Sequence, residues 1–139
     1  MKRFMESPIS LIVAFILAWV GNIAYSISGG SNTTPLKWLH LVITGLYIGV
    51  WLYYLMKGKY PLIGTVVFSL TLIASIVGFI IAKFRLLADW FIIPAVLFAT
   101  PFAGLQAFIK STFCWLAVAV ISVIMIALSL KRRNVINNA

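Results

Sequence analysis

The sequence predicts an all-α membrane protein, a polytopic bundle of five apolar helical segments with the fourth one broken. Of the 139 residues, 63% are hydrophobic and 9% are charged, whereas soluble domains are about half apolar and roughly a quarter charged. Nearly every charge lies in a short stretch between two long apolar runs, which is typical of helical membrane proteins. Two prolines, Pro94 and Pro101, interrupt the fourth run.

These runs leave no room for a separate soluble domain, so residues 1–139 are interpreted as one transmembrane domain. We expect helical segments at about 8–28, 35–56, 61–82, 86–109 and 111–130. Four or five of them are full spans, depending on the path of the fourth.

The first segment, residues 8–28, has clear start and stop patterns. Ser7-Pro8 places an N-cap serine before a proline at the first helical position, and Gly29-Gly30 follows the end. The basic start, apolar core and small residues also resemble a signal peptide, but we interpret the segment as the first span. Asn22 is its most polar residue and needs a partner inside the bundle.

The second segment, residues 35–56, carries different stripes on opposite sides. The polar and aromatic stripe consists of His40, Thr44, Tyr47, Trp51 and Tyr54. Gly45 and Gly49 lie near the reverse side, and their G-x-x-x-G spacing lets another helix approach closely. We therefore expect the glycines to face a helix and the first stripe to face the bundle interior or a cavity.

The third and fifth segments are simpler. Gly64, Ser75 and Gly78 belong to a face of small residues on segment 61–82, which predicts tight packing against the first segment or the broken one. Segment 111–130 is followed by a polar tail. Cys114 is the only cysteine, and we expect it to act as a small apolar helix residue.

The fourth segment, residues 86–109, is the one around which the bundle is expected to be organised. Pro94 and Pro101 each remove a backbone donor, which predicts unpaired carbonyls at Trp90 and Leu97 and a hinge at each proline. In hydrocarbon such carbonyls persist only where neighbouring helices, polar side chains or water satisfy them. Two half-helices, or one kinked helix, both fit this pattern.

The basic residues help to choose between the two paths. If residues 86–109 re-enter from outside, seven Lys and Arg residues lie inside and four outside; if they span, five lie inside and six outside. The first distribution fits the positive-inside rule better. We therefore favour a plasma (inner) membrane location with both termini in the cytoplasm.

The residues able to do chemistry are few and scattered. His40, Cys114, Glu6 and Asp89 are far apart in the sequence, with no metal-ligand spacing, paired carboxylates or glycine-rich phosphate loop. We expect no enzyme activity, cofactor or metal. The net charge of +9 comes from residues at span ends, which favours contact with anionic lipid headgroups over nucleic acid.

The function that fits best is a non-enzymatic membrane protein that acts through helix packing, as a homo-oligomer or as a small accessory subunit of a larger membrane complex. The alternative is a pore or carrier for a small or uncharged solute. A further alternative is a lipid- or quinone-binding protein that uses Trp19, Trp51, Tyr47 and Phe68. The candidate cavity residues are Asn22, His40, Thr44, Tyr47, Trp51, Thr100 and Gln106.

Overall fold

The computed structural model describes residues 7–27, 37–85 and 89–138, and all elements in these ranges are helical. The predicted all-α fold class is therefore confirmed. The α-helices are α2 (Ile9–Ile27), α3 (Lys37–Met56), α4 (Pro61–Phe84), α5 (Ile92–Ala99) and α6 (Ser111–Asn137). Two 3₁₀-helices, η1 (Asp89–Phe91) and η2 (Thr100–Ala107), flank α5.

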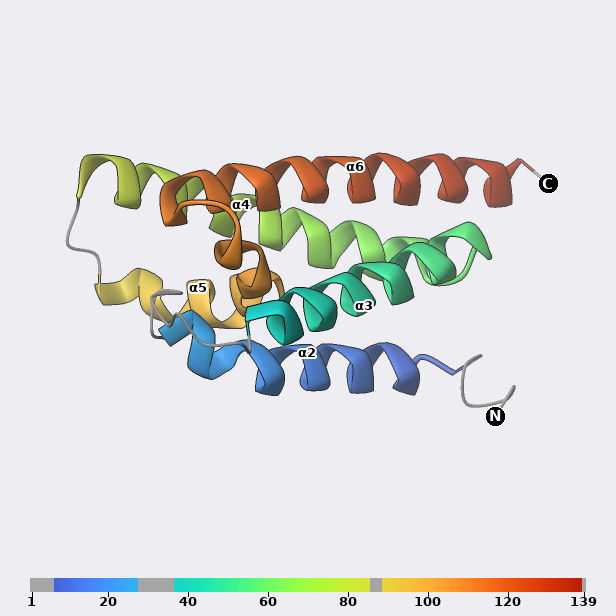
Figure 1. Ribbon diagram of the computed structural model, residues 1–139. Helices are drawn as coiled ribbons and strands as arrows, with labels where there is room; N and C mark the ends of the chain where they lie inside the picture. Colours follow the sequence, from blue (N-terminus) through green and yellow to red (C-terminus); the bar gives the residue numbers. More distant parts are fainter. Residues whose placement is uncertain (1–6, 28–36, 86–88, 139) are drawn as a thin grey trace.

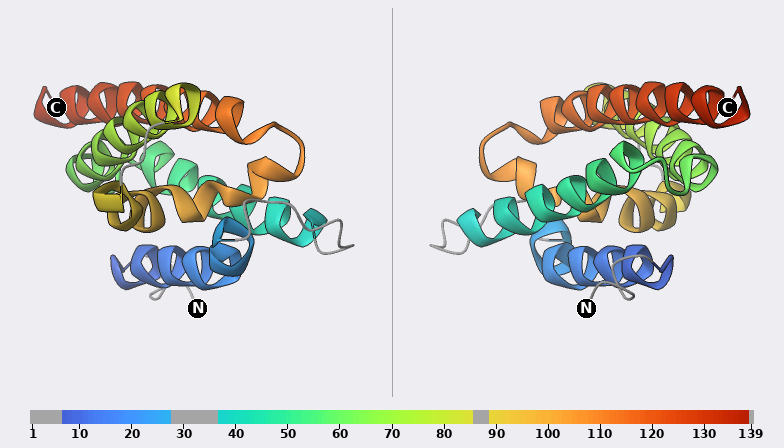
Figure 2. Two further views of the ribbon diagram at one scale, coloured as in Figure 1. Left: turned by 90° about the vertical axis from the view of Figure 1, so that its left-hand side faces the viewer. Right: turned by 90° about the vertical axis from the view of Figure 1, so that its right-hand side faces the viewer.

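Helices α2, α3, α4 and α6 run along one common axis and build the bundle (Figure 1). The 20 residues of α3 rise about 30 Å at 1.5 Å per residue, which is about the thickness of the hydrocarbon core of a bilayer. Viewed from the end, α4 and α6 lie on one side, α2 lies on the other, and α3 and α5 lie between them (Figure 2). The broken segment thus lies beside α3 between these helices, and its side chains Trp90, Ile92 and Ile93 are exposed on the outer surface.

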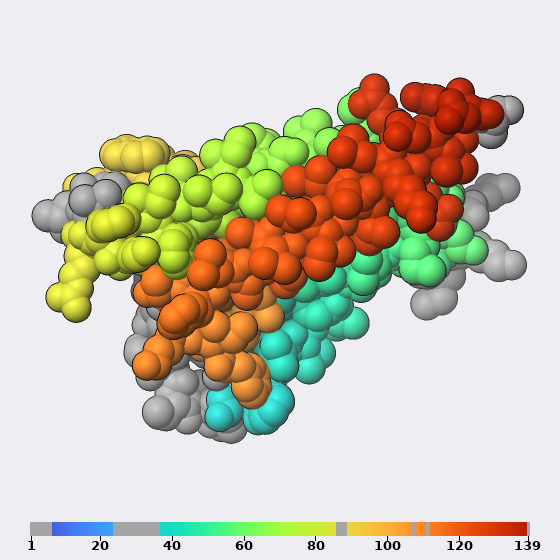
Figure 3. All heavy atoms as spheres, turned by 90° about the horizontal axis from the view of Figure 1, so that it is seen from above, coloured from blue at the N-terminus to red at the C-terminus, as the bar shows by residue number. Residues whose placement is uncertain are grey.

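The small-residue face of α4 packs mainly against α6, and α4 also contacts α5. A Cβ added at Gly78 would lie 2.7 Å from the Trp115 ring, and one added at Gly64 would lie 2.8 Å from Ser129 Oγ. Ser75 is fully buried on the same face. The space-filling view shows α6 alongside α4 (Figure 3). The expected pairing of this face with the first segment is therefore corrected, because the glycines accommodate side chains of α6.

Helix α6 continues well beyond the predicted end at residue 130 and reaches Asn137. The residues from Leu130 to Asn138 are exposed. Polar residues do not stop a helix by themselves, and Lys, Arg and Asn can all continue one on its solvated side. The tail is therefore a helical extension and not an irregular end.

The broken segment enters and leaves the bundle at the same end. By length and composition, Asp89–Gln106 could cross a membrane, as could Lys37–Met56, Pro61–Phe84 and Thr112–Asn137, whereas Ile9–Ile23 is shorter. Figure 1 shows, however, that the segment advances to the middle of the bundle and turns back. Its first turn contacts the start of α6 through Phe91 and Trp115, whose ring centroids are 5.9 Å apart.

The far end of this segment returns to the same level. The Phe108 ring lies 4.7 Å from that of Trp38, in the first turn of α3. The contacts of Phe91 with Trp115 and of Phe108 with Trp38 therefore place the start and the end of the segment at the same end of the bundle. Within the described ranges, four helices therefore run along the bundle, and residues 89–107 form a segment that enters and leaves it at the same end, as a re-entrant segment does.

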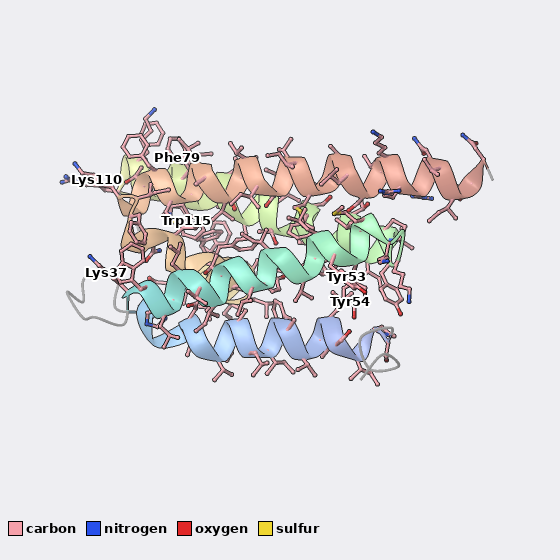
Figure 4. The ribbon with its side chains drawn as sticks, turned by 45° about the vertical axis from the view of Figure 1, so that its right-hand side comes forward. Lys37, Tyr53, Tyr54, Phe79, Lys110 and Trp115 are labelled. Carbon is pink, nitrogen blue, oxygen red and sulfur yellow. The ribbon has the colours of Figure 1, made fainter. Side chains whose placement is uncertain are left out.

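Basic side chains mark both ends of the bundle. Figure 4 shows Lys37 and Lys110 at one end and Tyr53 and Tyr54 at the other. Lys57 and Lys59 follow α3 at the second end, in a turn where Gly58 and Tyr60 both have positive φ angles, 69° and 55°. The apolar length of the bundle between these charged ends is consistent with an integral membrane protein.

Candidate functional site

A buried polar cluster lies where η2 crosses α2 and α3. We define the polar cluster as the side chains of Asn22, His40 and Thr44 together with the Pro101 carbonyl and the Gly104 N–H. Asn22 and Thr44 have exposed fractions of 0% and 1%. Polar groups this deep in an apolar bundle are costly unless they are paired, so their hydrogen bonds decide how stable the cluster is.

The Thr44 hydroxyl uses its full hydrogen-bonding capacity. It donates to the Pro101 carbonyl over 2.9 Å, and it accepts from Asn22 Nδ2 at 3.1 Å and from the Gly104 N–H at 3.2 Å. A hydroxyl has one donor and two acceptor lone pairs. Thr44 therefore links α2, α3 and η2, and neither its donor nor its two acceptor positions are left unused.

The Asn22 amide completes the hydrogen-bond network and determines which ring nitrogen of His40 carries the hydrogen. Its Nδ2 also donates to the Pro101 carbonyl at 3.2 Å. Because a carbonyl only accepts, the amide nitrogen has to face Pro101, and the amide oxygen therefore faces His40 Nδ1 at 3.1 Å. His40 Nδ1 must then carry a proton, which assigns the Nδ1–H tautomer to a neutral imidazole.

Gly104 makes the crossing of η2 and α3 possible. A Cβ at this position would overlap the backbone carbonyl of His40 and would lie 2.7 Å from Thr44 Oγ1. Any other residue would therefore separate the two backbones. Gly104 was not among the residues predicted from the sequence; a glycine three residues after Pro101 is the local pattern that could have indicated it.

Both prolines of the broken segment lie at the start of helical elements. Pro94 is in the first turn of α5, and Pro101 is at the first or second position of η2. Each proline therefore lies close to the junction between two consecutive helical elements. Val96 and Pro101 supply the carbonyls that receive side-chain donors: Trp19 Nε1 donates to Val96 O at 3.0 Å, while Asn22 and Thr44 bond Pro101.

The other candidate cavity residues pack against the core. Tyr47 makes an edge contact with Phe102 at 5.5 Å between centroids, and Trp51 contacts Phe68 at 5.2 Å. Thr100 is fully buried beside Pro101. Gln106 has a buried amide oxygen that no described residue bonds. The stripe thus faces the bundle interior, where Trp51 and Tyr47 also line hollows of about 440 Å³ and 470 Å³ whose walls are mainly apolar.

Gly45 and Gly49 are placed differently from the prediction. Among the described residues, nothing lies within 4 Å of a Cβ added at either position, so no other described helix packs on them. Within one chain, the predicted close contact of Gly45 and Gly49 with another helix is therefore wrong. The reason is that the polar stripe on the opposite side draws α3 toward η2 and leaves these glycines on the outer surface.

Comparison with protein-family models, with curated proteins and with solved structures found no match. Function has to be argued from geometry. In the described ranges no group of three or more His, Cys, Asp or Glu side chains could hold a metal ion. Cys114 is buried on α6. The polar cluster can hold η2 against α2 and α3, and its groups are oriented toward one another.

Proposed function

We propose that this chain is a non-enzymatic integral membrane protein that acts through helix packing, as a homo-oligomer or as a small accessory subunit of a larger membrane complex. The observation that carries the proposal is the closed polar cluster. The Pro101 carbonyl, which a transporter would offer to a solute, bonds the chain's own Asn22 and Thr44. In this proposal, the break in the helix at Pro101 therefore shapes a surface for packing against another helix or protein and does not bind a solute.

The extension of α6 supports a protein partner. Its last residues include the basic run Lys131, Arg132 and Arg133, and the apolar side chains of Val135 and Ile136 are 54% and 50% exposed. A helical extension with exposed apolar groups outside the bundle offers contact area to another chain. We propose this extension, on the cytoplasmic side of the plasma membrane, as the contact with a partner subunit.

Copurification in mild detergent tests the proposal. The tagged full chain should elute as a complex with itself or with a second protein, and a variant ending after Leu130 should lose that complex while keeping its melting temperature. The Val120→Ser variant is a matched control, because Val120 is an exposed apolar residue within the bundle. A monomeric full chain at every protein concentration, with no copurifying protein, would contradict the proposal.

The second candidate is a pore or carrier for a small or uncharged solute, and the re-entrant path of residues 89–107 favours it. Re-entrant segments bring helix ends into the membrane interior, where carriers bind their solutes. Against it, three hollows formed by described residues between the helices are lined mainly by apolar side chains. Vesicles that contain the pure protein and show solute uptake, abolished by Thr44→Val, would favour the carrier over the subunit.

A further inference from the structure

The outer face of the α2–α3 pair carries an apolar groove. One hollow of about 410 Å³ lies between the two helices, with Gly45 and Gly49 of α3 and Ala14 of α2 in its wall. A second hollow of about 470 Å³ adjoins it and shares Ala14 and Leu17. We call the two hollows together the α2–α3 groove. Its described lining contains no charged side chain, so the groove is suited to an apolar group.

The groove is as long as one leaflet of a bilayer is deep. On α3 it runs from Tyr54 to Ile43, which is about 16 Å at 1.5 Å per residue. On α2 it runs from Ser10 to Ala18, the middle of that helix. Half of a hydrocarbon core of about 30 Å is about 15 Å. The groove therefore starts at one membrane surface and ends near the midplane.

The groove opens at the membrane surface beside a cation and hydroxyl groups. Lys57 Nζ lies 6.0 Å from the centroid of the Tyr53 ring, and the Tyr53 and Tyr54 rings contact each other edge to face at 5.6 Å. The Ser10 and Tyr54 hydroxyls are hydrogen-bonded across the two helices. Tyrosine and lysine at this level are the side chains that meet lipid headgroups.

We propose that the α2–α3 groove binds one acyl chain of an anionic phospholipid, with the lipid phosphate beside Lys57 and Tyr53. The charge at the rim complements a phosphate, and the apolar groove complements a chain that reaches the midplane. A helix is about 10 Å wide and crosses both leaflets, so a groove confined to one leaflet fits a lipid chain better. This occupant also explains why Gly45 and Gly49 are open to the surface.

Native mass spectrometry of the full chain, released from nanodiscs of equal parts phosphatidylglycerol and phosphatidylcholine with identical chains, tests the site. The unmodified protein should retain phosphatidylglycerol at least fivefold over phosphatidylcholine. Gly49→Leu should reduce total retained lipid at least fivefold by filling the groove, and Lys57→Gln should abolish the preference for phosphatidylglycerol. Equal retention of both lipids by the unmodified protein would overturn the proposal.

Two control variants make these losses specific. Ala127→Leu adds the same bulk to an exposed position of α6, and Lys131→Gln removes a charge from the α6 extension; both should retain lipid as the unmodified protein does. Size measurement separates an effect of Gly49→Leu on lipid binding from an effect on assembly. A smaller oligomer with unchanged lipid retention would assign the groove to a second copy and overturn the lipid site.

A measurement on the unmodified chain covers the case in which Gly49→Leu does not fold. Phosphatidylglycerol with a diazirine at the middle of one acyl chain should crosslink to Leu17 and Leu46, which line both hollows of the groove. Crosslinks spread evenly over α2, α4 and α6 would show ordinary annular lipid and would overturn the proposal. This readout does not depend on the assembly proposed above.

Discussion

The Thr44 hydroxyl is the atom at which three segments distant in the chain meet. Thr44 and Asn22 are 22 residues apart, and Thr44 and Pro101 are 57 residues apart. Each group that it bonds is buried in an apolar bundle, where an unpaired donor or acceptor costs more than a formed bond gains. The buried side chains of Thr44 and Asn22 therefore hold the re-entrant segment in place.

Replacing Thr44 by valine keeps the shape of the side chain and removes these bonds. The Gly104 N–H loses its Thr44 acceptor and one Asn22 N–H loses its partner, so the free energy of unfolding should fall by about 1–3 kcal/mol. Unfolding by SDS titration in mixed micelles measures this change.

Thr71→Val is the matched control. Thr71 is equally buried, but its hydroxyl bonds only the Val67 carbonyl of its own helix. That carbonyl keeps its helical partner, so the loss should stay below about 1 kcal/mol. Equal losses for the two variants would show that the polar cluster is not the source of the stability.

Gly104→Ala tests the close crossing of η2 and α3. The added methyl group would overlap the His40 carbonyl, so overpacking should lower the free energy of unfolding by about 1–3 kcal/mol or more. Gly49→Ala should instead be neutral or stabilising by up to about 1 kcal/mol, since its Cβ meets open space and alanine favours a helix. The same SDS titration measures the free energy of unfolding of both variants. An equal change in the two would contradict the close approach of η2 to α3 at Gly104.

At the scale of the element, the broken segment shows how proline acts in a membrane. Pro94 and Pro101 lie near the starts of α5 and η2, where a missing N–H permits a change of direction between consecutive helical elements. The Gly104 N–H donates to the Thr44 hydroxyl of α3. Gly104 belongs to η2, a 3₁₀-helix of eight residues, which is longer than most such helices.

Pro101→Ala should therefore change little. The carbonyl that Asn22 and Thr44 bind is kept, and the new N–H can reach a carbonyl in the last turn of α5. We expect the free energy of unfolding to change by less than about 1 kcal/mol, which is less than for Thr44→Val. A loss as large as that of Thr44→Val, measured in the same titration, would show that the proline ring itself holds the break.

At the scale of the whole molecule, the re-entrant segment sets the topology. Residues 89–107 enter and leave the bundle at one end. The start of α2 and the end of α6 both lie at the opposite end of the bundle (Figure 1). A spanning segment would have placed them on opposite sides. With the positive-inside rule, this arrangement favours both termini on the cytoplasmic side.

Cysteine labelling in sealed cells measures this topology. In a Cys114→Ser background, an impermeant maleimide added outside should label Arg85→Cys and Lys110→Cys, which flank the re-entrant segment. It should not label Lys57→Cys or Asn138→Cys until the membrane is opened. Labelling of Arg85→Cys and Lys110→Cys from opposite sides would show that the segment spans.

The sequence by itself determined the class of the protein and the positions of its helices. Apolar runs, basic ends and the proline and glycine boundaries are local properties, and they predicted α2, α3 and α4 to within two residues at each end. Burial of Asn22 and Thr44 was also foreseeable, because a polar group on the inner stripe of an apolar helix needs a partner.

Only the tertiary structure decided the path of the fourth segment, the partner of α4 and the exposure of Gly45 and Gly49. Hydropathy reports how favourably residues leave water, and the same apolar residues leave water whether the segment crosses the membrane or turns back. The choice depends on hydrogen bonds such as that between Asn22 and Pro101, 79 residues apart, and on a backbone approach that Gly104 allows. Those contacts form between distant segments, so no local pattern contains them.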